Sequence, residues 1–118
     1  MTAEGKIVKA LKVLVVLLWI SLVGITWRAL HELGSDGGMV FLSDFLQPWR
    51  AQFNTDFSIH LLLFAIWVFW REKSKALGAV FALLCLMGGL FTLLYLLIAM
   101  HRAQGNVKSL LLGAHDSP

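Results

Sequence analysis

The sequence contains very little cysteine and little charge. Its one cysteine, Cys85, lies in an apolar run, which excludes an intrachain disulfide and any metal motif built from several cysteines. Charged residues make up 14% of the 118 residues, whereas 58% are hydrophobic, more than the roughly 45 to 50% typical of soluble domains. The composition therefore indicates one membrane domain, covering residues 1–118.

Sequence motifs of the common enzyme classes are also missing. The chain has no glycine-rich phosphate loop, no His-Glu-x-x-His, no Gly-x-Ser-x-Gly and no Cys-x-x-Cys. We therefore predict no catalytic residue and no metal site, and no particular cofactor is indicated. The net charge of +3 does not indicate a nucleic-acid partner, because the ten Lys and Arg residues flank apolar runs instead of forming one basic face.

Three segments are long and apolar enough to cross a bilayer core of about 30 Å, which takes about 20 helical residues. They cover residues 10–30, 48–71 and 76–100. The first has three lysines before or within its first turn, Lys6, Lys9 and Lys12. It has an arginine and bulky residues where a signal peptide has its cleavage site, so we expect an uncleaved span. The third carries no charge at all.

The second span has two possible starting points. Its uncharged run from Phe57 to Trp70 has 14 residues, which is about 21 Å of helix. A helix that begins at Pro48 is about 34 Å long, and proline suits a first helical turn because the N–H that it lacks has no partner there. The alternative begins at Asn54 or Thr55 and requires a locally thinner bilayer. We favour the longer helix.

The distribution of basic residues predicts the orientation. A cytoplasmic N-terminus places six Lys and Arg residues inside and four outside, in the sense of the positive-inside rule. Tryptophans then fall near both interfaces, as in an aromatic belt: they are Trp27, Trp49, Trp67 and Trp70. The prediction is a multi-pass protein of the cell inner membrane with its C-terminus on the outer side.

The segments outside the spans have contrasting patterns. The outer loop, residues 31–47, begins with a glycine-rich turn and continues with apolar residues at helical spacing, which predicts a short helix in the headgroup layer. The tail, residues 103–118, is small and polar, and we expect it to be mobile. The predicted fold class is thus an all-α membrane protein with three transmembrane helices and a short interfacial helix in the outer loop.

Polar residues gather at the outer ends of the three predicted spans. Asp56 and His60 are four residues apart on one helical face. A carboxylate near the centre of a span costs about 2.5 to 3.5 kcal/mol, so such groups usually face another helix or a cavity. One hypothesis is an outer polar pocket, with Asp56, His60, Tyr95 and Arg28 as its candidate residues. We favour a structural role, with Asp56 and His60 as contacts to neighbouring helices.

Small residues form a stripe along the third predicted span. They let helix backbones approach closely in lipid, so this span requires a close neighbour, which is the first span, the second span or another protein chain. The stripe consists of Gly78, Ala82, Cys85, Gly88, Gly89 and Thr92. Because three helices bury little surface alone, we expect a homo-oligomer or a larger membrane complex in the lipid bilayer.

The order of residues in the second and third spans resembles a known type of protein. Asp56, Trp67 and the Arg71–Glu72 pair are followed by a span that contains Gly88, Gly89 and Tyr95. This pattern, over about residues 45–100, resembles small bacterial three-span integral membrane proteins of unknown function. The resemblance implies an all-helical inner-membrane fold and no particular activity.

Three functional hypotheses are compatible with the sequence. The first is a non-enzymatic membrane subunit or accessory protein that packs against partner helices. The second is a small membrane enzyme or binder of a lipid-like or isoprenoid ligand that uses the outer pocket. The third is an oligomeric proton or ion path. We favour the first, since no motif of an enzyme is present.

Overall fold

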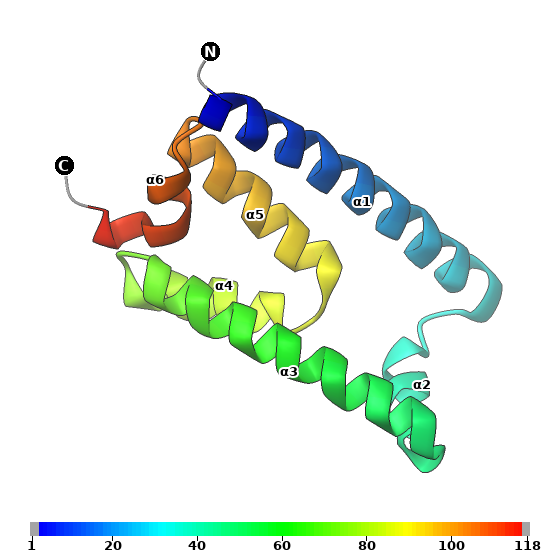
Figure 1. The fold of residues 1–118 in the computed structure, drawn as a ribbon. Helices are drawn as coiled ribbons and strands as arrows, with labels where there is room; N and C mark the ends of the chain where they lie inside the picture. The colour runs from blue at the N-terminus through cyan, green and yellow to red at the C-terminus, as the bar shows by residue number, and fades with distance from the viewer. Residues whose placement is uncertain (1–2, 117–118) are drawn as a thin grey trace.

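The computed structural model describes residues 3–116, and this range is helical with no strand (Figure 1). The all-α prediction is therefore confirmed for the described residues. The α-helices are α1 (Ala3–Leu33), α2 (Gly37–Ser43), α3 (Pro48–Arg71), α4 (Lys75–Cys85), α5 (Gly89–Ala103) and α6 (Val107–Leu112). Two 3-10 turns, η1 (Asp44–Leu46) and η2 (Gly113–His115), follow α2 and α6.

Among the described residues, two helices are long and apolar enough to cross a membrane: α1 with 31 residues and α3 with 24. Only 11% of the most apolar stretch of each helix is buried. Both helices therefore expose most of their apolar side chains, and apolar surface of this extent marks a contact with lipid or with another protein.

Helix α3 begins at Pro48, the start that the longer of the two sequence alternatives requires. Gln47 caps it, because its side-chain oxygen accepts a hydrogen bond of 2.8 Å from the backbone N–H of Arg50. Proline occupies the first turn, where a missing N–H costs no hydrogen bond. The outer loop before it contains α2 and η1 as two short helical segments.

The segment predicted as one third span is two helices in the structure. Helix α4 has 11 residues and α5 has 15, and the chain reverses between them (Figure 1). Gly88 makes the break possible, since its φ of 117° and ψ of −170° lie in a region that is essentially restricted to glycine. Hydropathy stays high across the break, which is why composition predicted a continuous helix.

This reversal brings the two ends of the described chain together (Figure 1). The Glu4 carboxylate, on the first turn of α1, accepts a hydrogen bond of 2.6 Å from the backbone N–H of Val107. The sequence placed the N- and C-terminal regions at opposite ends, and the structure places them at the same end. The segment expected to be a mobile tail forms α6 and η2, and Leu110 within it is buried.

Helix α5 packs against α1 along one seam. Val8 and Val15, seven residues apart on α1, are both buried, and Trp19 Nε1 donates a hydrogen bond of 3.0 Å to the Leu90 carbonyl. At Gly89, an added Cβ would lie 2.8 Å from Cδ2 of Leu22. A side chain at position 89 would therefore require the end of the Leu22 side chain to move.

Helix α4 packs against α3 in the same way. An added Cβ at Gly78 would lie 3.2 Å from the carbonyl oxygen of Phe69 on α3, and Cys85 at the other end of α4 is buried. Together with the contact at Gly89, these distances show that the close neighbours of the small-residue stripe include α3 and α1 of the same chain. The stripe holds the α4–α5 hairpin between the two long helices.

Candidate functional site

The four residues predicted to form an outer pocket are not assembled into one. His60 Nδ1 lies 3.2 Å from the Asp56 carboxylate and 2.8 Å from the Asp56 backbone carbonyl, so these two residues do form a pair. Their side chains are 75% and 56% exposed, respectively. Neither side chain forms a hydrogen bond or an ion pair with any other described residue.

Arg28 and Tyr95 lie elsewhere. Arg28 forms an exposed ion pair of 3.1 Å with Glu32, four residues later on the same helix. Tyr95 is buried and contacts Arg71 at the opposite end of α3. Because Asp56 and Arg71 are 15 residues apart on this helix, about 22 Å separates them.

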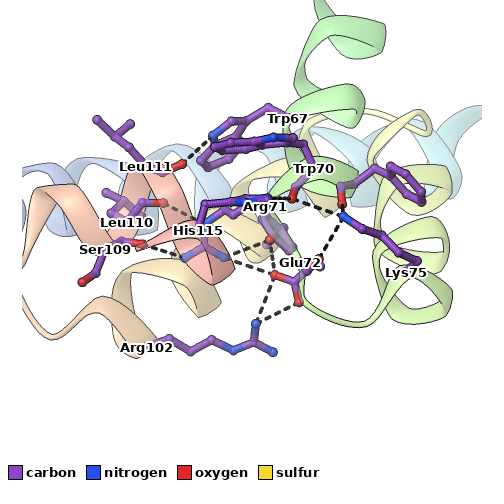
Figure 2. A network of polar contacts seen from close by, with 12 residues as sticks. Trp67, Trp70, Arg71, Glu72, Lys75, Arg102, Ser109, Leu110, Leu111 and His115 are labelled. Carbon is purple, nitrogen blue, oxygen red and sulfur yellow. Dashed lines mark hydrogen bonds and ion pairs between the residues drawn. The ribbon is translucent and has the colours of Figure 1, made fainter. Parts of the chain in front are cut away.

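The C-terminal end of α3 instead holds a polar group that we call the Arg71 cluster. It consists of the buried residues Arg71, Glu72 and Tyr95 and the exposed Arg102, and Figure 2 shows Arg71, Glu72 and Arg102 side by side. Tyr95 donates a hydrogen bond of 2.6 Å to Glu72 Oε2, and Arg71 Nη1 lies 3.2 Å from the same oxygen. Arg102 Nη1 contacts both carboxylate oxygens, at 3.0 and 3.2 Å. One carboxylate thus joins residues from α5 to the end of α3.

Arg71 also connects α3 to α6. Its Nε donates a hydrogen bond of 2.7 Å to the Leu110 carbonyl, and its Nη2 lies 3.4 Å from the Ser109 carbonyl. Trp67 Nε1 donates to the Leu111 carbonyl at 3.0 Å. The last carbonyls of a helix have no partner within that helix and carry partial negative charge, so a guanidinium and an indole N–H suit this position.

Lys75 and His115 bind the last carbonyls of α3 itself. Lys75 Nζ donates a hydrogen bond of 3.1 Å to the Phe69 carbonyl. His115 Nε2 lies 2.8 Å from the Trp70 carbonyl, which can only accept, so this nitrogen carries the proton. The imidazole also stacks on the Trp70 ring at 4.0 Å. Figure 2 shows these contacts arranged around one helix end.

The Arg71 cluster keeps its carboxylate ionised. Burial alone would raise the pKa of Glu72, but hydrogen bonds from Tyr95 and Arg102, with the charges of Arg102 and Arg71, hold it below its ordinary value. Two guanidinium groups therefore share one carboxylate. The cluster carries one excess positive charge at neutral pH.

Gly113 allows α6 and η2 to approach Arg71. Its φ is 54° with ψ of −118°, and an added Cβ would lie 2.7 Å from the Arg71 carbonyl oxygen and nearer still to its Cγ. Real Cβ atoms essentially never approach other atoms so closely. Only glycine fits this position without moving the C-terminal segment.

No family model, curated protein or solved structure matches this chain. Function is therefore inferred from the geometry.

Two cavities lie at the end of the molecule that holds both ends of the described chain. The larger, of about 840 Å³, is beside the Arg71 cluster and has lining residues of both charges, among them Lys73 and Asp116. The smaller, of about 300 Å³, lies between the start of α1 and the end of α5. Among residues 3–116, no group of three or more His, Cys, Asp or Glu side chains is placed to hold a metal ion.

Sequence reasoning missed the Arg71 cluster. It used the Arg71–Glu72 pair only as part of the pattern that resembles small three-span membrane proteins. Their partners Tyr95 and Arg102 follow Glu72 by 23 and 30 residues, so no local spacing connects them. The available signal was the charged pair directly at the end of an apolar helix, where both side chains require partners if they are buried.

Proposed function

We propose that this chain is an integral protein of the cell inner membrane that crosses the bilayer through α1 and α3. The α4–α5 hairpin enters between them and returns, so both described ends are cytoplasmic. The positive-inside rule supports this topology better than it supports three spans. Eight of the ten Lys and Arg residues lie at the end with both termini: Lys6, Lys9, Lys12, Arg71, Lys73, Lys75, Arg102 and Lys108.

Only Arg28 and Arg50 lie at the other end, so the cytoplasmic side has eight basic residues and the outer side has two. A three-span arrangement leaves six basic residues on the cytoplasmic side and four on the outer side, because it moves Arg102 and Lys108 to the outer side. The hairpin therefore strengthens the charge asymmetry that orients membrane proteins. Acidic residues at the outer end, such as Glu32 and Asp44, do not oppose it, since Asp and Glu contribute little to orientation.

Within this membrane, we infer that the chain is a non-enzymatic subunit or accessory protein that packs against partner helices in a homo-oligomer or larger complex. The exposed Asp56–His60 pair carries this proposal. Both side chains are exposed, neither forms a hydrogen bond or ion pair with another helix of the described chain, and a carboxylate at the lipid-facing surface of a span is costly. A neighbouring helix that supplies hydrogen bonds removes that cost.

The Arg71 cluster supports a structural role for the remaining polar groups. Within the described residues, every buried side-chain nitrogen or oxygen atom has a hydrogen-bond partner. Arg71 and Glu72 bind each other and the chain that surrounds them. Such a network stabilises one arrangement of α3, α5 and α6.

The test is purification of the full chain in mild detergent, with light scattering for its mass and mass spectrometry for bound proteins. We expect an assembly larger than a monomer, and we expect the Asp56→Asn, His60→Gln double variant to weaken it. Thr55→Ala is the matched control, because Thr55 is exposed on the neighbouring position of α3 and lies on a different face.

The same experiment separates the competing functions. A wild-type monomer without a bound protein would contradict the proposal. Loss of a bound lipid-like molecule from the double variant, with the assembly intact, would favour a ligand binder instead. A pH-dependent ion flux in liposomes that is lost with Asp56→Asn would favour an ion path.

A further inference from the structure

The smaller cavity, between the start of α1 and the end of α5, is positively charged. Its volume is about 300 Å³, and its polar lining includes Lys9, Lys12, His101 and Gln104, with no acidic residue among the lining residues. Buried Val8 and Met100 form its apolar part. This combination differs from the larger cavity, in which Glu72 and Asp116 accompany the basic residues.

The two lysines of this cavity have no counter-charge in the described part of the chain. No ion pair or side-chain hydrogen bond there involves Lys9, Lys12 or His101. The nearest acidic residue in sequence is Glu4, whose carboxylate binds the backbone N–H of Val107. In contrast, Arg71 and Arg102 in the Arg71 cluster already share Glu72. The smaller cavity therefore attracts an anion.

The position of the cavity along α1 suggests which anion is available. Lys12 is the last charged residue before 15 uncharged ones, residues 13–27. On α5, His101 directly follows the uncharged run that ends at Met100. Both helices thus change from apolar to basic residues at the cavity. In the proposed topology, this change lies at the depth of the lipid phosphate groups.

We propose that this cavity binds a phosphate group, supplied by the headgroup of an anionic phospholipid in the cytoplasmic leaflet. Lys9 and Lys12 provide the charge, and Gln104 provides amide donors. A volume of about 300 Å³ suits a headgroup, while acyl chains extend along the exposed apolar face of α1. Basic pockets between membrane helices on the cytoplasmic side are known to take such headgroups. The site rests on the proposed membrane topology but requires no partner protein.

The test uses the full chain in mild detergent, mixed with phosphatidylglycerol and phosphatidylcholine and examined by native mass spectrometry. We expect preferential retention of phosphatidylglycerol. Lys9→Gln and Lys12→Gln should each lower its affinity about fivefold, the change expected for one lysine near anionic lipid. Lys6→Gln is the matched control, since it removes the same charge one turn earlier, from a residue outside the cavity lining.

Three outcomes would overturn the proposal. They are equal retention of the two lipids, an equal effect of Lys6→Gln and Lys9→Gln, and unchanged binding in all variants. The lysines are exposed, so we expect the variants to fold, and their thermal unfolding is measured alongside.

A second arm distinguishes the source of the phosphate. Excess inorganic phosphate is added to the wild type and to the Lys9→Gln variant. If phosphate displaces phosphatidylglycerol from the wild type and does not bind the variant, the cavity is a phosphate site whose ligand is soluble. If the wild type retains phosphatidylglycerol in excess phosphate, the cavity is a site for the lipid headgroup. Neither result depends on whether Asp56 and His60 face a partner, so failure here is distinguishable from failure of the proposed function.

Discussion

The two ends of the molecule use their polar residues differently. At the end that holds both ends of the described chain, contacts join residues that are far apart in sequence, such as Tyr95 with Glu72 and Glu4 with Val107. At the other end, the main ion pairs are local and exposed: Arg28 binds Glu32, four residues away. The difference indicates that polar contacts at the first end hold the helices together, whereas those at the second leave the surface free for another molecule.

Removing the charge of Glu72 should have the largest effect on stability. Glu72→Gln leaves Arg71, which is 3% exposed, without its counter-charge, and breaking a buried ion pair costs about 3 to 5 kcal/mol. The matched change at the other end is Glu32→Gln, whose exposed pair should cost less than about 0.5 kcal/mol. Thermal unfolding in detergent compares the two. Equal shifts in Tm would contradict the difference between the ends.

A methyl group at Gly113 should have the next largest effect. Gly113→Ala forces both a disfavoured backbone conformation and an overlap with Arg71, and we expect a loss of about 2 to 3 kcal/mol. Gly37→Ala is the control, because an added Cβ there has no atom within 4 Å. Should both variants unfold at the wild-type temperature, α6 would not be held against α3 as described.

The pH dependence of stability should also come from the end with both termini. The pKa of Glu72 in the folded chain lies below its ordinary value of 4.5, so the unfolded state binds more protons in this range. The contribution of ionised Glu72 to the free energy of unfolding is complete above about pH 4.5. It is lost as the pH falls through the pKa of Glu72 in the folded chain. We expect Tm to drop in acid, and the Glu72→Gln variant to show a shallower drop. If the curves of Tm against pH are parallel for the wild type and Glu72→Gln, Glu72 is not the source of the pH dependence.

The smallest effect is expected for Asp56→Asn on the stability of the isolated chain. The Asp56–His60 pair is exposed and formed within one helix, so its loss should cost less than about 0.5 kcal/mol. Its effect should appear in assembly instead. A large drop in Tm of the monomer would mean that Asp56 holds this chain together, and would remove the contrast between the two ends.

Local sequence features were sufficient for the long helices. The charge-free runs and Pro48 indicated α1 and α3, and the amphipathic pattern after the glycines of the outer loop indicated a short helix where α2 and η1 lie. These features depend on residues close together in sequence. Hydropathy and helix-start signals are local properties, so a single sequence reveals them.

The hairpin and the Arg71 cluster depend on contacts that no local pattern contains. The break at Gly88 lies in an unbroken apolar run, and only the Gly88–Gly89 pair hinted at it. Tyr95 was assigned to the outer end because α5 was expected to continue the direction of α4. Once the chain reverses, the same residue lies beside Glu72, and the predicted pocket loses one of its members.

The reversal at Gly88, which places both described ends on the cytoplasmic side, is tested most directly by cysteine labelling. In a Cys85→Ala background, single substitutions Ala3→Cys, Ser35→Cys and Ala114→Cys are made at exposed positions. A membrane-impermeant maleimide should label position 35 in intact cells whose inner membrane is accessible, and positions 3 and 114 only after permeabilisation. Labelling of position 114 before permeabilisation would contradict the hairpin and restore three full spans.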